Sequence, residues 1–459
     1  MIPDLRSVLD VFESNNELIR IKEEVELNYQ ITAFCRLVSD ADGPALLFER
    51  IKGHTVPLAV NLFGTRRRIA LALETTEHKM TERNLECLKK PLPPKMVEAD
   101  LSDWVIMKGE DIDLYTLPHS IWNVGDGGAF ITAGVVMAPQ ASGEYNAGIY
   151  RMQIHSKNTC GVYMAPDHHV RRLLEAPGRS QPVEISVALG PPPALFLAAS
   201  SDFAVNESEV SIAGALQGEP LEFATGLTVD VPWPIRSEII IEGTLDGTLA
   251  EEGPFVEFTG YTTGSGPAPV MNVTAIYHRP RPIYHAAYVG KPPNETATVW
   301  REIEEAKALR VLQERFPIVK GLHRPPQIGR DFWCVISVDS ERAKPGMIGN
   351  LLLGAAYCLP RPKFLIVVDD DVDIYRLEDV LWALSMRVNP QRDSFFAPNT
   401  MTSGLDPCGP TPPLTSKLLI DATKKKGFRG TLGVPTEEAF DFARQTLAKY
   451  LKTEAKGIS

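Results

Sequence analysis

The sequence is poor in cysteine and has no pair of cysteines at metal-binding spacing. Six cysteines occur in 459 residues, and no C-x-x-C motif is present. Zinc knuckles and disulfide frameworks need closely and regularly spaced cysteines, so neither is expected. We predict reduced thiols, as in the cytoplasm, at Cys35, Cys87, Cys160, Cys334, Cys358 and Cys408.

Long apolar runs are also missing. No stretch approaches the roughly 20 apolar residues that cross a bilayer as a helix. The first residues, Met-Ile-Pro-Asp-Leu-Arg, lack the basic and then apolar pattern of a secretory signal. We therefore expect no membrane span and a cytoplasmic localisation.

Positive charge is in deficit, because 47 Lys and Arg residues face 58 Asp and Glu residues, for a net charge of −11. Most of such a surface repels a polyanion, so neither nucleic acid nor an anionic membrane is an expected partner. A small-molecule substrate is the better expectation. The length of 459 residues exceeds what one hydrophobic core usually organises and predicts two or three domains.

The first hundred residues alternate between helical and strand-like patterns. Residues 5–12 place apolar side chains on one helical face, and residues 18–21, 44–51 and 56–63 have the composition of strands. A further helix is expected after Arg66. This region is predicted to be a small α/β unit.

From about residue 115 to residue 290, short β-branched runs alternate with Gly and Pro. Residues 130–136, 183–189 and 238–242 are examples, and their spacing predicts a sheet-rich barrel or sandwich. Helical spacing returns at Val299, Trp300, Ile303, Ala306 and Leu309, behind Asn294 as a candidate N-cap.

The last part of the chain again mixes strands and helices. Residues 364–368 are a continuous apolar run typical of a buried strand, and residues 377–388 predict a helix. Thr436 can cap a final helix, one face of which would carry Phe440, Ala443, Leu447 and Leu451.

These patterns predict a multidomain protein of mixed α+β and α/β class. We expect a small N-terminal α/β domain over residues 1–112 and a sheet-rich domain over residues 113–295. A C-terminal α/β domain with a terminal helix would take residues 296–459.

The first cluster with chemical potential is Asn146-Ala-Gly-Ile149-Tyr150-Arg151, where a carboxamide and a guanidinium stand five residues apart in an apolar context. A buried arginine needs a partner, so one interpretation is an internal salt bridge. The other is an anion clamp, because the planar guanidinium fork matches a carboxylate or a phosphate.

The second cluster holds Glu251, Glu252 and Glu257 around Gly253-Pro254. Gly-Pro bends the chain and could direct two acids toward one pocket. Burial and mutual repulsion would then raise the pKa of one acid and make it a proton donor, while a nearby arginine would keep the other ionised. A solvated acidic turn is the alternative.

The third cluster joins Pro166-Asp167-His168-His169 with Ser208-Glu209. Together with the Asn146 carboxamide, an imidazole and a carboxylate suit a hard or borderline ion such as Mg or Mn. The alternative is that both histidines are surface residues at the start of a helix.

Taken together, these clusters resemble the UbiD-like decarboxylases over essentially the whole chain. The motifs that carry the resemblance include Asp126-Gly127-Gly128, Asn146 to Gln153, Pro166-Asp167-His168, Ser208-Glu209, Glu252 to Gly260, Val368 to Asp373, Trp382-Ala-Leu and Asp421-Ala-Thr423. The resemblance is greatest to the branch that acts on aromatic or heteroaromatic acids. It implies a central split β-barrel that binds a flavin and a C-terminal domain that forms oligomers, at least a homodimer.

The resemblance also implies a cofactor site. Prenylated FMN would be the cofactor, and its phosphate would be bridged by a divalent metal, Mn or Mg, with K as a further candidate ion. The implied metal ligands are Asn146, His168 and Glu209, with His169 as the competing histidine. Ile149, Tyr150, Arg151 and Asp167 would complete the cofactor site, and a separate flavin prenyltransferase would supply the cofactor.

By the same resemblance, Arg151, Glu252 and Glu257 form the catalytic set for reversible, non-oxidative decarboxylation of an aromatic, heteroaromatic or α,β-unsaturated acid. Arg151 would grip the substrate carboxylate, Glu252 would orient Arg151, and Glu257 would give a proton to the carbon after CO2 leaves. The protein would supply geometry and electrostatics, and the cofactor the electrophile.

Two other functions stay open at this point. A flavin-dependent oxidoreductase would need a nicotinamide site, and the sequence has no fingerprint for one. A non-catalytic flavin- or metal-binding assembly protein of the same fold would not need the three charged residues.

Three other acidic, glycine-rich or basic motifs and one arginine have simpler interpretations. Asp369, Asp371 and Asp373 imitate the start of a calcium loop, but the sixth and twelfth positions do not fit, and an acidic turn is predicted. Residues 125–128 are expected to form a turn near the pocket, and residues 424–426 a solvated lysine run. Arg301 is a candidate for binding a second carboxylate, or for pairing with Glu304 or Glu305 along its helix.

Overall fold

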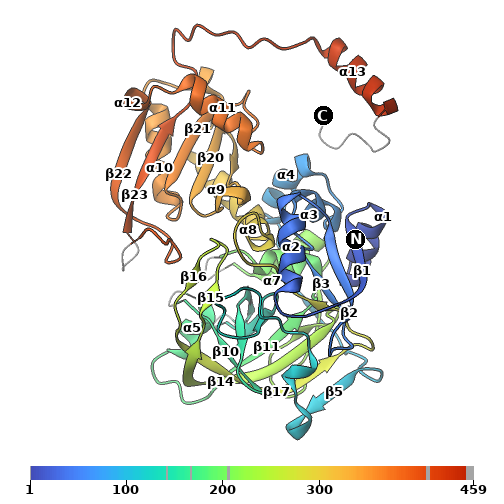
Figure 1. Ribbon diagram of the computed structural model, residues 1–459. Coiled ribbons are helices and arrows are strands. Elements are labelled where there is room, and N and C mark those ends of the chain that lie inside the picture. The colour runs from blue at the N-terminus through green and yellow to red at the C-terminus, as the bar shows by residue number, and fades with distance from the viewer. Residues whose placement is uncertain (1, 141–142, 166–167, 204–206, 410–413, 451–459) are drawn as a thin grey trace.

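The computed structural model describes residues 2–140, 143–165, 168–203, 207–409 and 414–450 (Figure 1). The predicted multidomain α/β architecture with a central sheet-rich part is confirmed. Within the described residues, no helix combines the length and the apolar character needed to cross a membrane. All six cysteines lie in the described ranges and are free thiols.

The N-terminal unit is a four-stranded sheet covered by helices. Its strand order is β1-β2-β3-β18, so two residues from much later in the chain complete the sheet. Asp4 caps the first helix by accepting a hydrogen bond from the Ser7 backbone N–H at 3.0 Å. The predicted third strand, residues 56–63, is wrong in extent, because only residues 58–60 pair. The elements are β1 (Leu18–Val25), β2 (Ala45–Ile51), β3 (Leu58–Val60), β18 (Tyr284–His285), α1 (Leu5–Ser14), α2 (Gln30–Asp40), α3 (Arg66–Ala72) and α4 (Glu77–Cys87).

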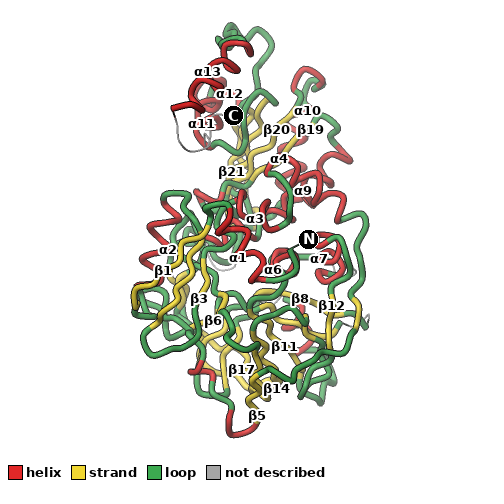
Figure 2. The backbone as a smooth tube through the Cα atoms, turned by 90° about the vertical axis from the view of Figure 1, so that its right-hand side faces the viewer, coloured by secondary structure: helices red, strands yellow, loops and turns green. Residues whose placement is uncertain are grey.

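The central unit is a curled sheet in which β14 (Ile239–Glu252) and β17 (Gly266–His278) are long antiparallel neighbours (Figures 1 and 2). The strand order is β6-β9-β10-β17-β14-β11-β7-β8, and β5 also pairs with β17. The run at residues 183–189 is a strand as predicted. The other members are β5 (Val105–Lys108), β6 (Phe130–Ile131), β7 (Val135–Pro139), β8 (Tyr145–Ile149), β9 (Met152–Ile154), β10 (Thr159–Val162) and β11 (Val183–Leu189).

Short elements close the central unit. The helices α6 and α7 pack against β8, and the hairpin of β15 and β16 follows the end of β14. These elements are α5 (His169–Leu174), α6 (Pro193–Ala199), α7 (Glu209–Gln217), β4 (Lys95–Met96), β12 (Glu222–Ala224), β13 (Trp233–Pro234), β15 (Phe255–Val256), β16 (Thr262–Thr263), η1 (Gly109–Asp111) and η2 (Leu114–Thr116).

The C-terminal unit has a five-stranded sheet of order β19-β20-β21-β23-β22 with an apolar cluster on each face. The helical pattern after Asn294 forms two helices, because α8 ends at Val299 and α9 begins at Glu302. Asn294 is the predicted N-cap and accepts from the Ala297 N–H at 2.9 Å. The elements are α8 (Glu295–Val299), α9 (Glu302–Arg315), α10 (Met347–Cys358), α11 (Leu377–Arg387), α12 (Pro390–Asp393), β19 (Val319–His323), β20 (Trp333–Val338), β21 (Phe364–Asp369), β22 (Ser394–Met401), β23 (Leu414–Asp421), η3 (Pro326–Ile328) and η4 (Ser340–Arg342).

The last helix, α13 (Glu437–Tyr450), stands away from the sheets at the end of an extended segment (Figure 1). Thr436 caps it as predicted, because its side chain accepts from the Ala439 N–H at 3.3 Å. Phe442 and Tyr450 are largely exposed. Of the predicted apolar face, Leu451 lies outside the described residues.

Candidate functional site

A buried ion cluster forms where β8 leads into β9. Arg151 lies between these strands, and its Nε and Nη2 bind Glu252 Oε1 and Oε2 at 2.8 and 2.9 Å. Its Nη1 also binds Glu257 Oε1. The two acids are 101 and 106 residues away along the chain, and all three side chains are nearly buried. The fold therefore brings together the three residues that the sequence singled out for catalysis.

Glu257 and Arg151 are shielded from solvent, and both have a pKa that departs from its ordinary value. Burial raises the pKa of Glu257, and the Arg151 charge only partly opposes this effect. Burial works against the Arg151 charge, yet the hydrogen bond to Glu252 and the charge of Glu257 raise the pKa of the guanidinium. Arg151 thus stays charged, while Glu257 can hold a proton above the usual range of a glutamate.

Aromatic rings cover the arginine. The guanidinium carbon of Arg151 lies 4.1 Å from the centre of the Tyr163 ring and 5.0 Å from that of Phe255. The Tyr163 N–H also donates to the Arg151 carbonyl at 3.1 Å. Such contacts stabilise a desolvated cation. The motif that holds Glu252 and Glu257 already contained Phe255, whereas sequence reasoning missed Tyr163, because only the pairing of β9 with β10 places it beside Arg151.

The bend that joins Glu252 to Glu257 is held by a neighbouring turn, as expected for residues 125–128. The Gly253 N–H donates to Gln153 Oε1 at 2.8 Å, and the Val256 N–H donates to Asp126 Oδ1 at 2.8 Å. The Gly127 N–H donates to the Pro254 carbonyl at 2.7 Å. A Cβ on Gly127 would lie 2.1 Å from the Gly253 carbonyl oxygen, so only glycine fits there.

A second polar pair lies at the start of β8. The Asn146 Nδ2 donates to Glu209 Oε1 at 3.0 Å, and the Ala147 N–H donates to Glu209 Oε2 at 3.3 Å. Glu209 is the first residue of α7, whose cap is Ser208. Burial raises the pKa of Glu209 to about 7, although these hydrogen bonds oppose the shift.

The Asn146 carboxamide has an unused acceptor, because its Oδ1 is buried and has no hydrogen-bond partner. A bare carbonyl oxygen beside a carboxylate is a donor set that Mg or Mn prefers. Within the described ranges there is no group of three or more His, Cys, Asp and Glu that could hold a metal.

The two candidate histidines have different surroundings. His168 packs edge-on against the Tyr150 ring at 5.3 Å, and its Nδ1 accepts from the Ala165 N–H at 3.2 Å. His169 lies in α5, and its Nε2 is 3.2 Å from the Pro139 carbonyl oxygen. Each histidine therefore has one ring nitrogen on a backbone group, and the choice of His168 over His169 as a ligand stays a prediction. Asp167 lies outside the described residues.

Ile149 ends β8 and is half-buried, and Tyr150 follows it and is buried. They connect the Asn146 pair to the Arg151 cluster along one stretch of chain. The Asn146 pair and the Arg151 cluster are thus two polar groups carried by the same short segment of chain.

The remaining sequence signals have structural explanations. Arg301 is buried and pairs with the adjacent Glu302 at 3.1 Å rather than with Glu304 or Glu305, and its binding of a second carboxylate stays a prediction. Arg387 binds Asp369 at 2.8 Å and Asp371 at 2.9 Å, which confirms an acidic turn.

The lysine run near residue 424 is not simply a solvated face. Lys424 Nζ lies 2.6 Å from Asp371 Oδ2, so at least this lysine belongs to the same ion cluster as Arg387.

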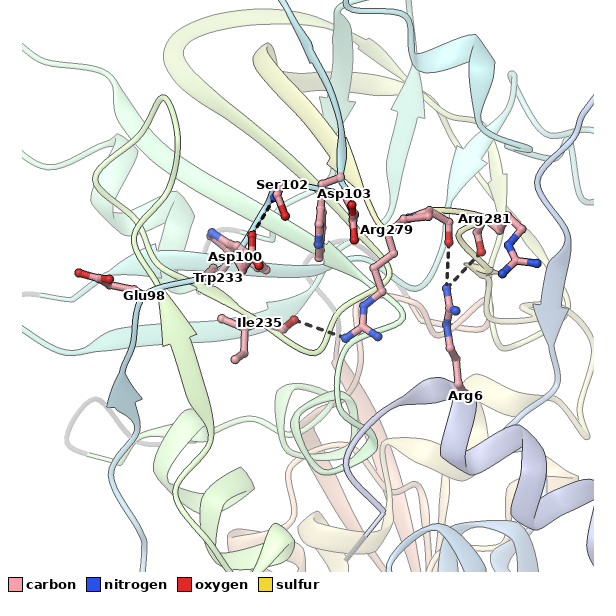
Figure 3. A pocket seen from close by; sticks show the side chains of 12 residues that line it. Arg6, Glu98, Asp100, Ser102, Asp103, Trp233, Ile235, Arg279 and Arg281 are labelled. Carbon is pink, nitrogen blue, oxygen red and sulfur yellow. Dashed lines mark hydrogen bonds between the residues drawn. The ribbon is translucent and has the colours of Figure 1, made fainter.

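A surface cavity of about 510 Å³ lies between α1 and the end of β17, and Figure 3 shows its walls. Arg6 Nη2 donates to the carbonyls of Pro280 and Arg281 at 3.5 and 3.1 Å, and Arg279 Nη2 donates to the Ile235 carbonyl at 3.5 Å. Arg6 thus ties α1 to the segment that follows β17, and Arg279 ties that segment to the residue after β13. As far as the structure describes the chain, no candidate site residue lines this cavity.

Three family models match the chain, one for each of its three units. The N-terminal, Rift-related and C-terminal domain models of 3-octaprenyl-4-hydroxybenzoate carboxy-lyase match residues 9–88, 95–292 and 297–422. The Rift-related match spans the strands of the curled central sheet.

Solved structures agree over nearly the full length. The UbiD-class enzyme HmfF from Pelotomaculum thermopropionicum, in complex with FMN, shares 31% identity, covers 96% of this chain and 99% of its own, and has a TM-score of 0.89. An evolved dimeric form of HmfF in complex with prFMN shares 30% identity over 98% of this chain and 100% of its own, with a TM-score of 0.85. Vanillic acid decarboxylase from Sedimentibacter hydroxybenzoicus, in open form, shares 29% identity over 98% of both chains, with a TM-score of 0.87.

These similarities define the class of the protein, which is a carboxy-lyase. The chain belongs to the UbiD family. The resemblance stated from the sequence motifs is thereby confirmed.

Proposed function

We propose that the protein decarboxylates an aromatic, heteroaromatic or α,β-unsaturated carboxylic acid, with prenylated FMN bound by the curled central sheet. The observation that carries this proposal is the buried cluster of Arg151, Glu252 and Glu257 within a UbiD-family fold. FMN and prFMN in the HmfF structures support the choice of cofactor.

Arg151 is proposed to bind the substrate carboxylate. Both oxygens of Glu252 hold two of its nitrogens, which fixes the plane of the guanidinium. Glu257 contacts the remaining terminal nitrogen, so the incoming carboxylate would compete with Glu257 for it. Such competition would release Glu257 from Arg151 when the acid is bound.

Glu257 is proposed to be the proton donor. Its raised pKa keeps it protonated over a wider pH range than an exposed glutamate, and this proton can pass to the carbon that loses CO2. When bound, the cofactor supplies an electrophilic ring that accepts the electron pair left by CO2. Because the same groups serve the reverse reaction, carboxylation at high CO2 is also expected.

Asn146, Glu209 and His168 are proposed to hold a divalent ion, Mn or Mg, at the cofactor phosphate, with K as a further candidate. Asn146 fits this role because its Oδ1 has no hydrogen-bond partner. Glu209 fits because its buried carboxylate has a raised pKa, which a metal ion would lower by stabilising the charged form. For Nε2 of His168 to bind the ion, Nδ1 must carry the proton. His168 must therefore first give up the hydrogen bond from the Ala165 N–H or turn its ring. Ile149, Tyr150 and Asp167 are proposed to complete the flavin site.

The remaining expectations concern partners and place. We propose a flavin prenyltransferase as cofactor supplier, assembly into at least a homodimer through the C-terminal unit, and a cytoplasmic location. The exposed aromatic residues on α13 support a role of this helix in assembly.

The test is co-expression with a flavin prenyltransferase, followed by denaturing mass spectrometry and a panel of aromatic and unsaturated acids. Prenylated FMN together with CO2 release supports the proposal. Oxidation of reduced nicotinamide without CO2 release would instead indicate an oxidoreductase, and neither activity in a loaded protein would indicate a binding protein.

A further inference from the structure

A buried arginine of the C-terminal unit reaches the segment that carries Glu257. Arg330 lies between η3 and β20 and is 2% exposed. Its guanidinium carbon is 4.5 Å from the centre of the Trp300 ring and 5.0 Å from that of Phe258. Phe258 follows Glu257 directly, so the cation touches the residue next to the proposed proton donor.

Contacts other than the one with Arg330 also hold Phe258 in place. Its carbonyl accepts from Asn294 Nδ2 at 3.0 Å, and its ring lies 6.4 Å from both the Trp300 and the Phe332 rings. The Phe258 backbone N–H also favours the charged form of the Glu257 carboxylate and so lowers its pKa. The position of this residue therefore affects both the direction and the proton affinity of Glu257.

The buried position of Arg330 is energetically unfavourable for a positive charge. Its Nε is buried and has no hydrogen-bond partner, and its ion pair with Asp331 is long at 3.4 Å. Burial lowers the pKa of Arg330 to about 10, with the charge of Asp331 acting against the shift. Besides the charge of Asp331, the faces of the Trp300 and Phe258 rings stabilise this cation.

We propose that Arg330 is a positioning residue, which holds the Phe258 ring and thereby directs Glu257 toward the reacting carbon. The inference rests on the proposed function of Glu257 as proton donor. It assigns the C-terminal unit a part in proton transfer, because Arg330 and Phe258 belong to different matched domains.

The nearby Arg324 is a matched control. It is also buried, binds the same Asp331 carboxylate at 2.5 Å and donates to the Arg330 carbonyl at 3.2 Å. Within the described part of the chain it contacts no aromatic ring face. Arg324→Gln should therefore lower stability without changing the proton-transfer step.

The experiment measures kcat, KM, cofactor content and the solvent deuterium isotope effect on kcat for cofactor-loaded Arg330→Gln. We expect kcat to fall about 10- to 100-fold, since a displacement of about 1 Å can cost such a factor. KM and cofactor content should stay close to the parent values. The isotope effect should rise, because proton delivery becomes rate-limiting, and Arg324→Gln should keep the parent isotope effect. Arg330→Lys, which keeps the charge, should recover part of the lost kcat.

Phe258→Leu tests the same link if Arg330→Gln does not fold, and it should likewise lower kcat and raise the isotope effect. Parent-like kcat in either variant, or a loss with an unchanged isotope effect as in Arg324→Gln, would overturn the inference. Failure of the proposed function has a different signature: Glu257→Gln would then keep the parent kcat, whatever the Arg330 variants do.

Discussion

Substitution of Gly127 tests whether the turn at residues 125–128 positions the acids of the site. In Gly127→Ala, the new Cβ would lie 2.1 Å from the Gly253 carbonyl oxygen, 2.6 Å from the Gly253 carbonyl carbon and 2.9 Å from the Pro254 nitrogen. All three contacts are with backbone, so no side-chain rotation can relieve them. The two turns must separate by about 0.9 Å to reach the 3.0 Å that real Cβ contacts respect.

That separation would move the bend between Glu252 and Glu257. We expect kcat/KM to fall about 100-fold, the cost of a displacement near 1 Å at a reacting group. Overpacking should also lower the free energy of unfolding by about 1–3 kcal/mol. Steady-state decarboxylation and urea unfolding measure the two effects.

Gly266→Ala is the matched control, because no heavy atom beyond the two adjacent residues lies within 4 Å of the Cβ position at Gly266. It should keep parent activity and stability. A Gly127→Ala enzyme with parent kcat/KM would refute the argument that this turn sets the position of the acids.

Three further predictions address polar and charged side chains. Glu257→Gln should reduce kcat by about 100- to 10,000-fold, the usual contribution of a general acid. An acid must hold its proton to donate it, so the activity of the parent enzyme should be present below the raised pKa of Glu257 and lost as pH rises through it. A pH–rate profile measures this loss. Asn146→Ala removes the unpartnered acceptor and should weaken Mn binding about 10- to 100-fold by calorimetry. Arg6→Ala leaves the fully buried Glu238 carboxylate without its bidentate partner and should cost about 1–3 kcal/mol in urea unfolding.

Each of these changes has a matched control. Glu251→Gln alters an exposed acid beside the site and should keep kcat. Asn158→Ala alters an exposed carboxamide and should keep Mn affinity. Arg20→Ala removes a partly exposed pair with Glu13 and should cost less than about 1 kcal/mol. Equal effects in a test variant and its control would contradict the corresponding prediction.

Local patterns were sufficient for much of the secondary structure. The continuous run at residues 364–368 forms β21, and the capping residues Asn294 and Thr436 start α8 and α13. These predictions succeeded because a cap, a turn or an apolar run depends mainly on neighbouring residues.

Predictions failed where distant segments decide the local conformation. The helix expected to run past Trp300 is interrupted there, where Trp300 packs on Arg330 and Arg301 pairs with Glu302 in a buried ion cluster. The strand β18 completes the N-terminal sheet, although more than two hundred residues separate it from its neighbour β3. Neither contact leaves a periodic signal in the sequence.

For the candidate site, the sequence by itself determined the chemical inventory: an arginine, two acids near a Gly-Pro bend, and an Asn, His and Glu set. Only the tertiary structure decided that Arg151 binds both acids, that Asn146 meets Glu209, and that Arg330 reaches Phe258. The physical reason is that residue type sets which interactions a side chain can make, whereas strand pairing and burial set its distances, its partners and hence its pKa.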